Sequence, residues 1–210
     1  MMTYNISMDN KNKTSTTREN KKYQKVCFIG HRRIGFGPIR ERLKTAIENE
    51  IKNGCKFFRM GTHGEFDEMA LSVCRELRKT YKHITIEVVI TSFKTIEPII
   101  DHDEIFGDEK YYPYADVQTT MYNIEEEHYK RQIIASNKQM VDSCDTLICY
   151  VNKKHNPSGA KTTMNYAKKQ GKTIINIYKP EDSPTYSKTI GKITKEIDEY
   201  FNKIKKKPGD

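Results

Sequence analysis

Short apolar segments alternate with amphipathic helical patterns along most of this chain, and this alternation limits its fold more than any other feature. Residues 25–29, 56–60, 84–91, 146–151 and 173–178 have the length and composition of strands. Apolar residues at helical spacing cover 39–51, 66–81, 124–143 and 162–170. Strands that alternate with helices form a parallel sheet with right-handed crossovers. The sequence therefore predicts a three-layer α/β domain, with a mainly parallel sheet of about five strands and helices on both faces.

The regular pattern predicts one domain over residues 24–180, with both ends of the 210-residue chain outside it. Residues 1–23 are rich in Asn, Lys, Thr and Ser and lack periodicity, so we expect a disordered or extended N-terminal arm. For residues 181–210 we expect a linker and a C-terminal helix over about 188–205 that packs on the domain.

Residues 92–123 are the least regular part of the predicted domain. A loop of this length either serves a function, such as a lid over a site, or contains short elements that the pattern does not reveal. The tyrosines at 111, 112 and 114 are able to stack on a base. Packing beneath the long loop explains them slightly better.

The formal net charge of +9 is concentrated near the two ends of the chain. Residues 1–25 contribute +4 and residues 188–210 contribute +3, which leaves +2 for residues 26–187. A protein that binds nucleic acid through its folded surface needs a basic patch or stripe there. This distribution therefore argues against nucleic acid as a partner.

The cysteines predict a reducing compartment. Five of them are present, at 27, 55, 74, 144 and 149, without metal-ligand spacing. We expect buried, reduced thiols, no metal and no cofactor in a cytoplasmic protein. No apolar stretch reaches the roughly 18 residues that span a bilayer, and the polar N-terminus has no signal-peptide core, so we expect no membrane association. The composition leaves a monomer and a homo-oligomer both open.

Small or cationic residues follow three of the predicted strands. They are Gly30, His31 and Arg32 after the first strand, Gly61, Thr62 and Gly64 after the second, and Ser158, Gly159, Ala160, Lys161 and Thr162 after the fourth. The carboxyl ends of parallel strands lie at one edge of the sheet, where open α/β sheets bind their ligands. Small residues at a helix start let backbone N–H groups approach an anion, which the helix dipole also favours. The pattern predicts a site for a nucleotide-like ligand that carries phosphate.

Two cations are candidates for phosphate contacts. Arg32 has a planar guanidinium that pairs with two phosphate oxygens, although an exposed cation at an ordinary strand end is the alternative interpretation. Lys161 offers a point charge within the expected phosphate cradle. Arg131 is either a ligand contact or the helical partner of Glu127, four residues earlier.

Asp67 and Glu65 are the candidates for any acid–base role. Asp67 lies in the first turn of a predicted helix, where the dipole favours a carboxylate. That position explains Asp67 about as well as contact with a ribose hydroxyl does. Asn137 lies on the apolar face of a later helix, where a buried amide needs hydrogen-bond partners. It binds either the ligand or a backbone loop.

Several segments occur in an order typical of one superfamily. They are FIGHR at 28–32, GTHGEFD at 61–67, NKQMVD at 137–142, DTLICYV at 145–151, SGAKT at 158–162 and GKTIINI at 171–177. Over about residues 25–178 the chain resembles the SLOG superfamily of Smf/DprA and LOG-like Rossmann domains. Within it, the chain is most similar to the small YpsA-like proteins of Firmicutes and their phages. The resemblance implies a Rossmann-like domain that binds nucleotides or nucleotide derivatives.

The LOG-like enzymes of that superfamily cleave the N-glycosidic bond of cytokinin nucleotides, with a PGGxGTxxE motif whose Glu acts on the ribose. Pro157, Gly159 and Thr162 match this motif, but Asn165 stands where the Glu falls. An amide is neither a carboxylate base nor a counter-charge for an oxocarbenium-like transition state.

We therefore predict a sensor or sequestering protein that binds a nucleotide or nucleotide-derived small molecule, rather than an enzyme. The first alternative is a LOG-like hydrolase or transferase of nucleoside N-glycosidic bonds, with Asp67 or Glu65 replacing the missing Glu. The second alternative is DNA binding, as in the Smf/DprA branch.

Overall fold

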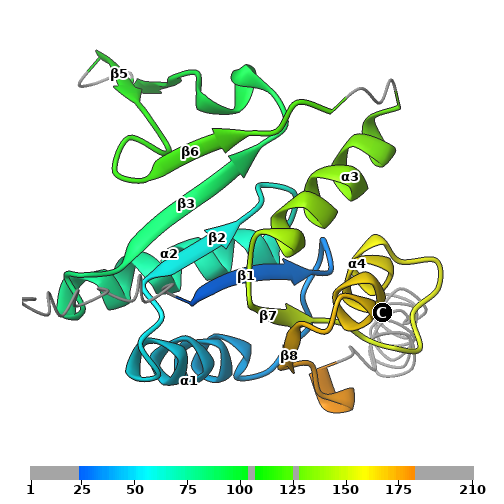
Figure 1. Ribbon diagram of the computed structural model, residues 1–210. Coiled ribbons are helices and arrows are strands. Elements are labelled where there is room, and N and C mark those ends of the chain that lie inside the picture. The colour runs from blue at the N-terminus through cyan, green and yellow to red at the C-terminus, as the bar shows by residue number, and fades with distance from the viewer. Residues whose placement is uncertain (1–23, 104–106, 125–127, 183–210) are drawn as a thin grey trace, which may run out of the picture.

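The computed structural model of the chain describes residues 24–103, 107–124 and 128–182. Within them, one parallel sheet has six strands in the order β6-β3-β2-β1-β7-β8 (Figure 1). The strands of this sheet are β1 (Lys25–Gly30), β2 (Phe57–Met60), β3 (Thr85–Ile90), β6 (Gln118–Met121), β7 (Thr146–Tyr150) and β8 (Thr173–Asn176). The α-helices are α1 (Ile39–Lys52), α2 (Glu65–Thr80), α3 (Tyr129–Asp142) and α4 (Gly159–Lys169).

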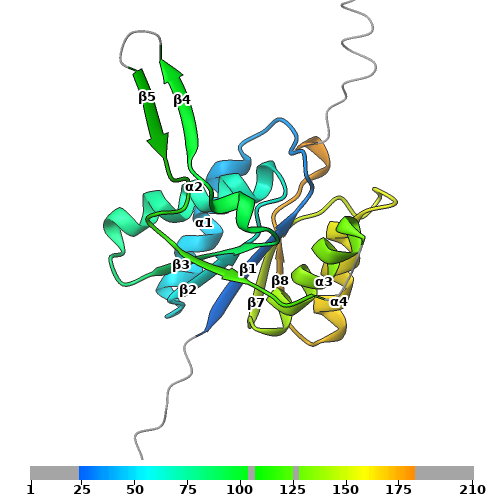
Figure 2. The same ribbon diagram turned by 90° about the horizontal axis from the view of Figure 1, so that it is seen from above.

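Helices cover both faces of the sheet (Figure 2). α1 and α2 pack on one face, in a core that includes Phe28 and Phe58. α3 and α4 pack on the other face, in a core that includes Cys27 and Leu147. Every residue of β7 is buried, as expected for a central parallel strand that is enclosed on both sides. The predicted three-layer α/β fold is confirmed.

β1 and β7 lie side by side at the centre of the sheet, with Ile29 opposite Cys149 and Gly30 opposite Tyr150. From β1 the chain builds outward through β2, β3 and β6, and it then crosses to the other side of β1 to form β7 and β8. The segment after β1 leads to α1 on one face, and the segment after β7 leads to α4 on the other face. This reversal of strand order is the position where such sheets bind ligands.

The five predicted strands and the four predicted helices of the described residues are all present. The helix boundaries differ at two places. α3 begins at Tyr129, with His128 as its N-cap, rather than at residue 124. α4 begins at Gly159 rather than at residue 162, because the Ser158 side chain caps the helix by accepting the Lys161 N–H.

The irregular segment over residues 92–123 contains short elements. They are a 3₁₀ turn (Phe93–Ile96), the antiparallel hairpin of β4 (Ile99–Asp103) and β5 (Gly107–Tyr111), and the edge strand β6. β6 has only four residues, of which three are polar, so it has no apolar alternation for the sequence to show. Tyr114 packs against the core beside α2, whereas Tyr111 and Tyr112 are exposed.

Some expectations concern residues outside the described part of the chain. The N-terminal arm, the C-terminal helix and Glu127 lie there, and the domain boundaries remain predictions. Within the described residues, no helix combines the length and the apolar character needed to cross a membrane. All five cysteines are described, and each is free and buried as predicted.

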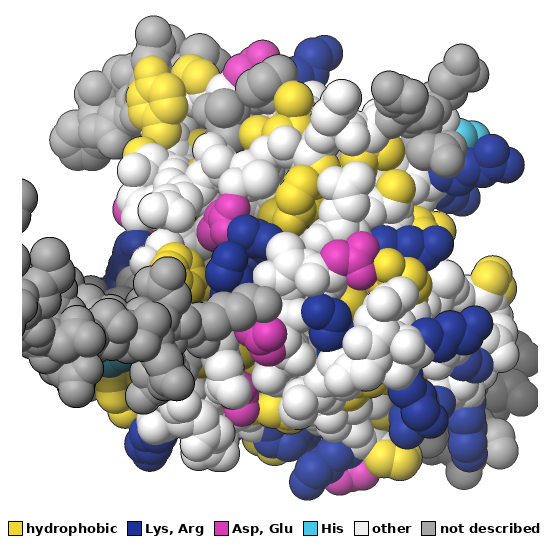
Figure 3. All heavy atoms as spheres, in the orientation of Figure 1, with side chains coloured by type: hydrophobic (Ala, Val, Ile, Leu, Met, Phe, Trp, Pro, Cys, Tyr) yellow, Lys and Arg dark blue, Asp and Glu magenta, His cyan; other side chains and the backbone are white. Residues whose placement is uncertain are grey.

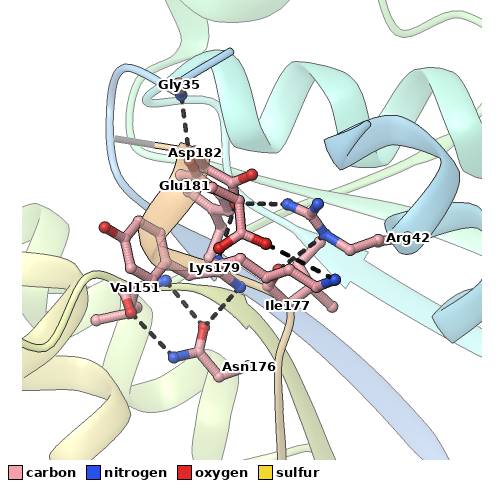
Figure 4. Close-up of polar contacts among 10 residues, drawn as sticks. Gly35, Arg42, Val151, Asn176, Ile177, Lys179, Glu181 and Asp182 are labelled. Atoms are coloured by element: carbon pink, nitrogen blue, oxygen red, sulfur yellow. Dashed lines mark hydrogen bonds and ion pairs between the residues drawn. The ribbon is translucent and has the colours of Figure 1, made fainter. Parts of the chain in front are cut away.

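A buried carboxylate fixes the last described residue to the domain. Asp182 is 0% exposed, and its Oδ2 atom accepts hydrogen bonds from the Arg42 guanidinium at 2.5 Å and the Lys179 N–H at 2.9 Å (Figure 4). Arg42 also donates to the Ile177 carbonyl at 3.1 Å. Because a buried charge must be paired and hydrogen-bonded, this cluster ties the segment after β8 to α1.

The charged side chains do not form a single stripe on the face shown in Figure 3. Lys and Arg lie there in several groups, with Asp and Glu between them. The described residues visible on this face therefore form no continuous basic patch of the kind that nucleic-acid binding requires.

Candidate functional site

A cavity of about 260 Å³ lies at the carboxyl edge of the sheet, where β1 and β7 end. We call it the carboxyl-edge cavity. It is lined by the end of β1 and the following residues (Ile29, Gly30, His31, Arg32), the start of α2 (His63, Asp67), the wall of α3 (Ile133, Ile134, Asn137) and the entry to α4 (His155, Pro157, Ser158, Gly159, Ala160). Segments that are far apart in the sequence therefore converge at the reversal of strand order.

The N-terminus of α4 forms one wall of this cavity. Ser158 Oγ accepts the Lys161 N–H at 3.2 Å, and the first turn contains no acidic residue. The N–H groups of Gly159 and Ala160 have no acceptor among the described residues. The positive end of the helix dipole and two available amides thus face the cavity, an arrangement that suits an anion.

His31 connects the end of β1 to the entry of α4. The Asn152 N–H donates to His31 Nε2 at 2.8 Å, so Nε2 carries no proton, and Nδ1 lies 3.4 Å from Ser158 Oγ. The neutral ring therefore has its proton on Nδ1, directed at Ser158. Burial lowers the pKa of His31, and the nearby His155 lowers it further. A neutral His31 positions Ser158 rather than supplying positive charge.

Arg32 contributes the guanidinium of this cavity, and its backbone holds the start of α2. Its carbonyl accepts the Glu65 N–H at 2.9 Å. A Cβ atom on Gly64 would lie 2.6 Å from Arg32 Cα, so the close approach of these two backbones requires glycine. The Glu65 carboxylate accepts the Ile34 N–H at 2.9 Å. The loop after β1 is thereby fixed, and the exposed Arg32 side chain remains available for a ligand.

Asp67 brings a carboxyl group into the cavity from the first turn of α2. Its Oδ2 atom accepts the His63 N–H at 3.0 Å. Burial raises the pKa of Asp67 to about 7; the His63 hydrogen bond opposes this shift and the Glu68 charge adds to it. Desolvation therefore outweighs the stabilisation that a helix N-terminus gives a carboxylate. Near neutral pH, Asp67 can exist both as an acid and as a base.

His63 closes the cavity beside Asp67. Its Nε2 atom lies 3.2 Å from Thr91 Oγ1, and its Nδ1 atom lies 3.3 Å from the Tyr129 hydroxyl. Burial lowers the pKa of His63, and the Arg32 charge lowers it further. Both ring nitrogens are thus occupied by hydroxyl groups of the protein.

Eight of the predicted site residues line the cavity. They are Gly30, His31, Arg32, Asp67, Asn137, Ser158, Gly159 and Ala160. Asn137 is half-buried and lies in the α3 wall beside Ile134. A Cβ atom on Gly159 would meet only Ile134, at 4.0 Å, so this position faces open space.

The other predicted residues do not line the cavity; they are Gly61, Thr62, Gly64, Glu65, Arg131, Lys161 and Thr162. Lys161 Nζ donates to Asn156 Oδ1 at 2.9 Å, and Thr162 Oγ1 donates to the Ser158 carbonyl at 3.1 Å. Arg131 is exposed near the start of α3.

The two glycines after β2, Gly61 and Gly64, leave space for neighbouring protein atoms rather than for a ligand. Gly64 has an extended backbone with a φ of 176°, and neither Gly61 nor Gly64 is among the glycines in the left-handed region, so the left-handed conformation is not the reason for glycine here. A Cβ atom on Gly61 would lie 3.0 Å from Asp67 Oδ2. Gly61 leaves room for that carboxyl, and Gly64 leaves room for the Arg32 backbone.

Six lining residues were not among the predicted site residues; they are Ile29, His63, Ile133, Ile134, His155 and Pro157. Ile133 and Ile134 belong to an apolar helix face that predicts core packing, and a single sequence gives no sign that part of this face borders a cavity. His155 lies in an exposed loop, where only the folded chain places its ring 5.2 Å from that of His31. Within the described residues, no group of three or more His, Cys, Asp or Glu side chains is placed to hold a metal ion.

The site can be compared with known proteins. A family model described as the YspA SLOG family matches residues 21–182. This match includes every residue that lines the carboxyl-edge cavity. No curated protein matches the chain.

Proposed function

The chain belongs to the SLOG superfamily, in the family described as YspA SLOG, and on this premise we propose that the carboxyl-edge cavity binds a nucleotide or a nucleotide-derived small molecule. The observation that supports this most is the convergence of the α4 amides, the Ser158 hydroxyl and the Arg32 guanidinium on one cavity. Amides at a helix start and an arginine fork are both favourable partners of phosphate oxygens. The protein would act as a sensor or a sequestering protein.

The remaining walls suit the sugar of such a ligand. Asp67 and Asn137 offer hydrogen-bond acceptors for hydroxyl groups, and Ile133 and Ile134 offer apolar contact. Inorganic phosphate would leave these walls unused. A small number of polar groups beside apolar surface is typical of sites for organic ligands.

We infer that this binding takes place in the cytoplasm. The five free, buried cysteines support this location, because a reducing compartment keeps thiols unpaired.

The proposal is tested by identifying what the purified protein retains. We expect mass spectrometry of the small molecules released on denaturation to find a phosphate-bearing nucleotide derivative. Arg32→Ala should lose this compound. Lys79→Ala should retain it, because Lys79 is an exposed cation of α2 that does not line the cavity. Equal recovery from both variants, or failure of wild type to bind any nucleoside monophosphate by calorimetry, would contradict the proposal.

A second candidate function is hydrolysis of a nucleoside N-glycosidic bond. Asp67 favours it, since a carboxyl in the cavity with a pKa of about 7 suits proton transfer near neutral pH. Water would add to the anomeric carbon as the C–N bond breaks, and the base would depart with the electrons of that bond. The Asp67 carboxylate would accept the proton of the water and pass it to the departing base. Asn165, which aligns with the missing Glu of the LOG-like motif, is exposed on α4 outside the cavity.

An assay for free base separates the two functions. We expect no base to be released from a panel of nucleoside monophosphates at a rate above that of the buffer. Release by wild type that is lost in Asp67→Asn, while Glu65→Gln remains active, would establish the enzyme instead. Glu65 is the matched control because its carboxylate binds the Ile34 N–H outside the cavity.

A further inference from the structure

A second cavity, of about 330 Å³, adjoins the carboxyl-edge cavity on the β8 side. The two cavities share His31, Arg32 and His155. The His31 ring lies 5.2 Å from that of His155 and 6.3 Å from that of Tyr150. His31 and His155 therefore lie between the two cavities and belong to the wall of each.

Two tyrosines form the aromatic wall of the second cavity. The rings of Tyr150 and Tyr178 meet edge to face, with centroids 5.3 Å apart. Tyr150 is held in place because its hydroxyl accepts the Gly35 N–H at 3.2 Å and its ring stacks on Phe66 at 5.9 Å. The Tyr178 N–H donates to Asn176 Oδ1 at 3.3 Å, which fixes the backbone after β8. The wall is thus pre-formed.

We propose that the second cavity binds the base of the nucleotide whose phosphate lies at the start of α4, with Tyr178 as the stacking surface. This inference rests on the proposed function and extends it to recognition of the base. Stacking on an aromatic side chain accepts any base, because every base has a π-face. The second cavity also contains Asn152 and Arg33, whose polar groups suit the edge of a base.

The dimensions of the cavities support this division of the ligand. At about 260 Å³ the carboxyl-edge cavity is smaller than the roughly 300–1,000 Å³ of typical ligand sites, and the second cavity adds about 330 Å³ beside it. A third cavity of about 280 Å³, lined by Thr91 and Tyr122, lies beyond His63 but shares no lining residue with the first. The second cavity is therefore the continuous extension among the described residues.

Calorimetry with paired probes tests the inference. Ribose 5-phosphate fills the phosphate and sugar positions, and the monophosphates of adenosine, guanosine, cytidine and uridine add a base. We expect wild type to bind at least one monophosphate about tenfold more tightly than ribose 5-phosphate. Tyr178→Leu should abolish this preference and leave the affinity for ribose 5-phosphate within about twofold. Tyr178→Phe, which keeps the ring, should retain the preference.

Tyr166→Leu is the matched control, since Tyr166 is a half-buried tyrosine of α4 that lines neither cavity. It should bind all probes as wild type does. Equal affinities of wild type for ribose 5-phosphate and every monophosphate would overturn the inference and leave the proposed function intact. Equal weakening of both probe classes by Tyr178→Leu would also overturn it. Failure of every probe to bind wild type would instead overturn the proposed function.

A measurement on the wild-type protein covers the case in which Tyr178→Leu does not fold. In the complex with the tightest monophosphate, nuclear Overhauser effects should connect the base protons to the Tyr178 ring. Effects to the ring of Tyr122, in the cavity beyond His63, would place the base there and overturn the inference.

Discussion

α2 and α4 both begin at the carboxyl edge of the sheet, each directly after a parallel strand, but their N-termini differ. α4 has a serine cap, no acidic residue in its first turn, and open space beside Gly159. α2 begins after Gly64 without a side-chain cap, and its first turn contains Glu65, Asp67 and Glu68. By topology alone, the two helix starts are equally suited to bind an anion. Their residues make them different, because only the first turn of α2 is acidic.

The two helices differ in which groups accept hydrogen bonds from the backbone N–H groups at their N-termini. At α2, the Arg32 carbonyl accepts the Glu65 N–H, and the Arg32 backbone occupies the space beside Gly64. At α4, the amides of Gly159 and Ala160 have no acceptor among the described residues. The protein thus fills one helix start with its own chain and leaves the other available to a ligand. Four predictions test this contrast.

The largest expected effect concerns the carboxyl at the start of α2. The pKa of Asp67 is about 7 in the folded chain and about 3.9 in an unfolded one, so the folded state binds more protons between pH 4 and pH 7. Stability should therefore fall as the pH rises through that window. Asp67→Asn removes this loss and should be about 2–4 kcal/mol more stable than wild type at pH 8.

Urea unfolding of wild type and variant between pH 4 and pH 8 measures the difference. Glu41→Gln is the control, because Glu41 is an exposed acid in the first turn of a different helix, α1, and does not contribute to the pKa of Asp67. If the free energy of unfolding depends on pH in the same way for Asp67→Asn and wild type, Asp67 is a solvated charge and the start of α2 is open to water.

Arg32 belongs to both helix starts, through its backbone at α2 and its side chain at the cavity beside α4. Arg32→Ala removes only the side chain. We expect a loss of about 1.5–3 kcal/mol in ligand binding, or roughly tenfold to a hundredfold in affinity, because a charge-assisted hydrogen bond disappears. Calorimetry with the ligand found on the purified protein checks this value. Lys79→Ala should bind normally, because Lys79 is an exposed cation that lines neither cavity, and equal losses in both variants would indicate a general effect of charge.

Most of the fold was predictable because its strands and helices have apolar patterns that are visible within short stretches of sequence. β1, β7 and the helices carry apolar patterns that only a buried strand or an amphipathic helix explains. β6 and the hairpin of β4 and β5 were not predictable, since three of the four residues of β6 are polar and form no apolar alternation. Their pairing depends on contacts with β3 and with each other rather than on a local pattern.

The lining of the carboxyl-edge cavity was predictable where the backbone defines it and less predictable where side chains define it. The ends of β1 and β7 place Gly30, His31, Arg32 and Ser158 at one edge through topology alone. Lys161 was expected beside them. However, α4 begins three residues earlier than predicted, and the Lys161 side chain donates a hydrogen bond to Asn156 instead.

The glycines at the two helix starts should respond oppositely to a methyl group. Gly64→Ala places a Cβ atom 2.6 Å from the Arg32 backbone, and such overpacking should cost about 1–3 kcal/mol of stability. Gly159→Ala meets nothing closer than Ile134 at 4.0 Å and does not have a positive φ, so stability should be maintained. Thermal unfolding of both variants checks this. A Gly159→Ala loss equal to that of Gly64→Ala would show that the start of α4 is also filled.

The smallest expected effect concerns the cap that distinguishes α4 from α2. Ser158→Ala leaves the Lys161 N–H without its side-chain acceptor and should cost about 1 kcal/mol of stability. Thr162→Ala is the control, because it also removes a hydroxyl from this helical turn but leaves the cap intact. Ligand affinity should fall in Ser158→Ala alone, since Ser158 lines the cavity and Thr162 does not. Urea unfolding and calorimetry on both variants separate the two roles. A loss of stability with unchanged affinity would make Ser158 only a cap, and the anion would then depend on the α4 amides and Arg32.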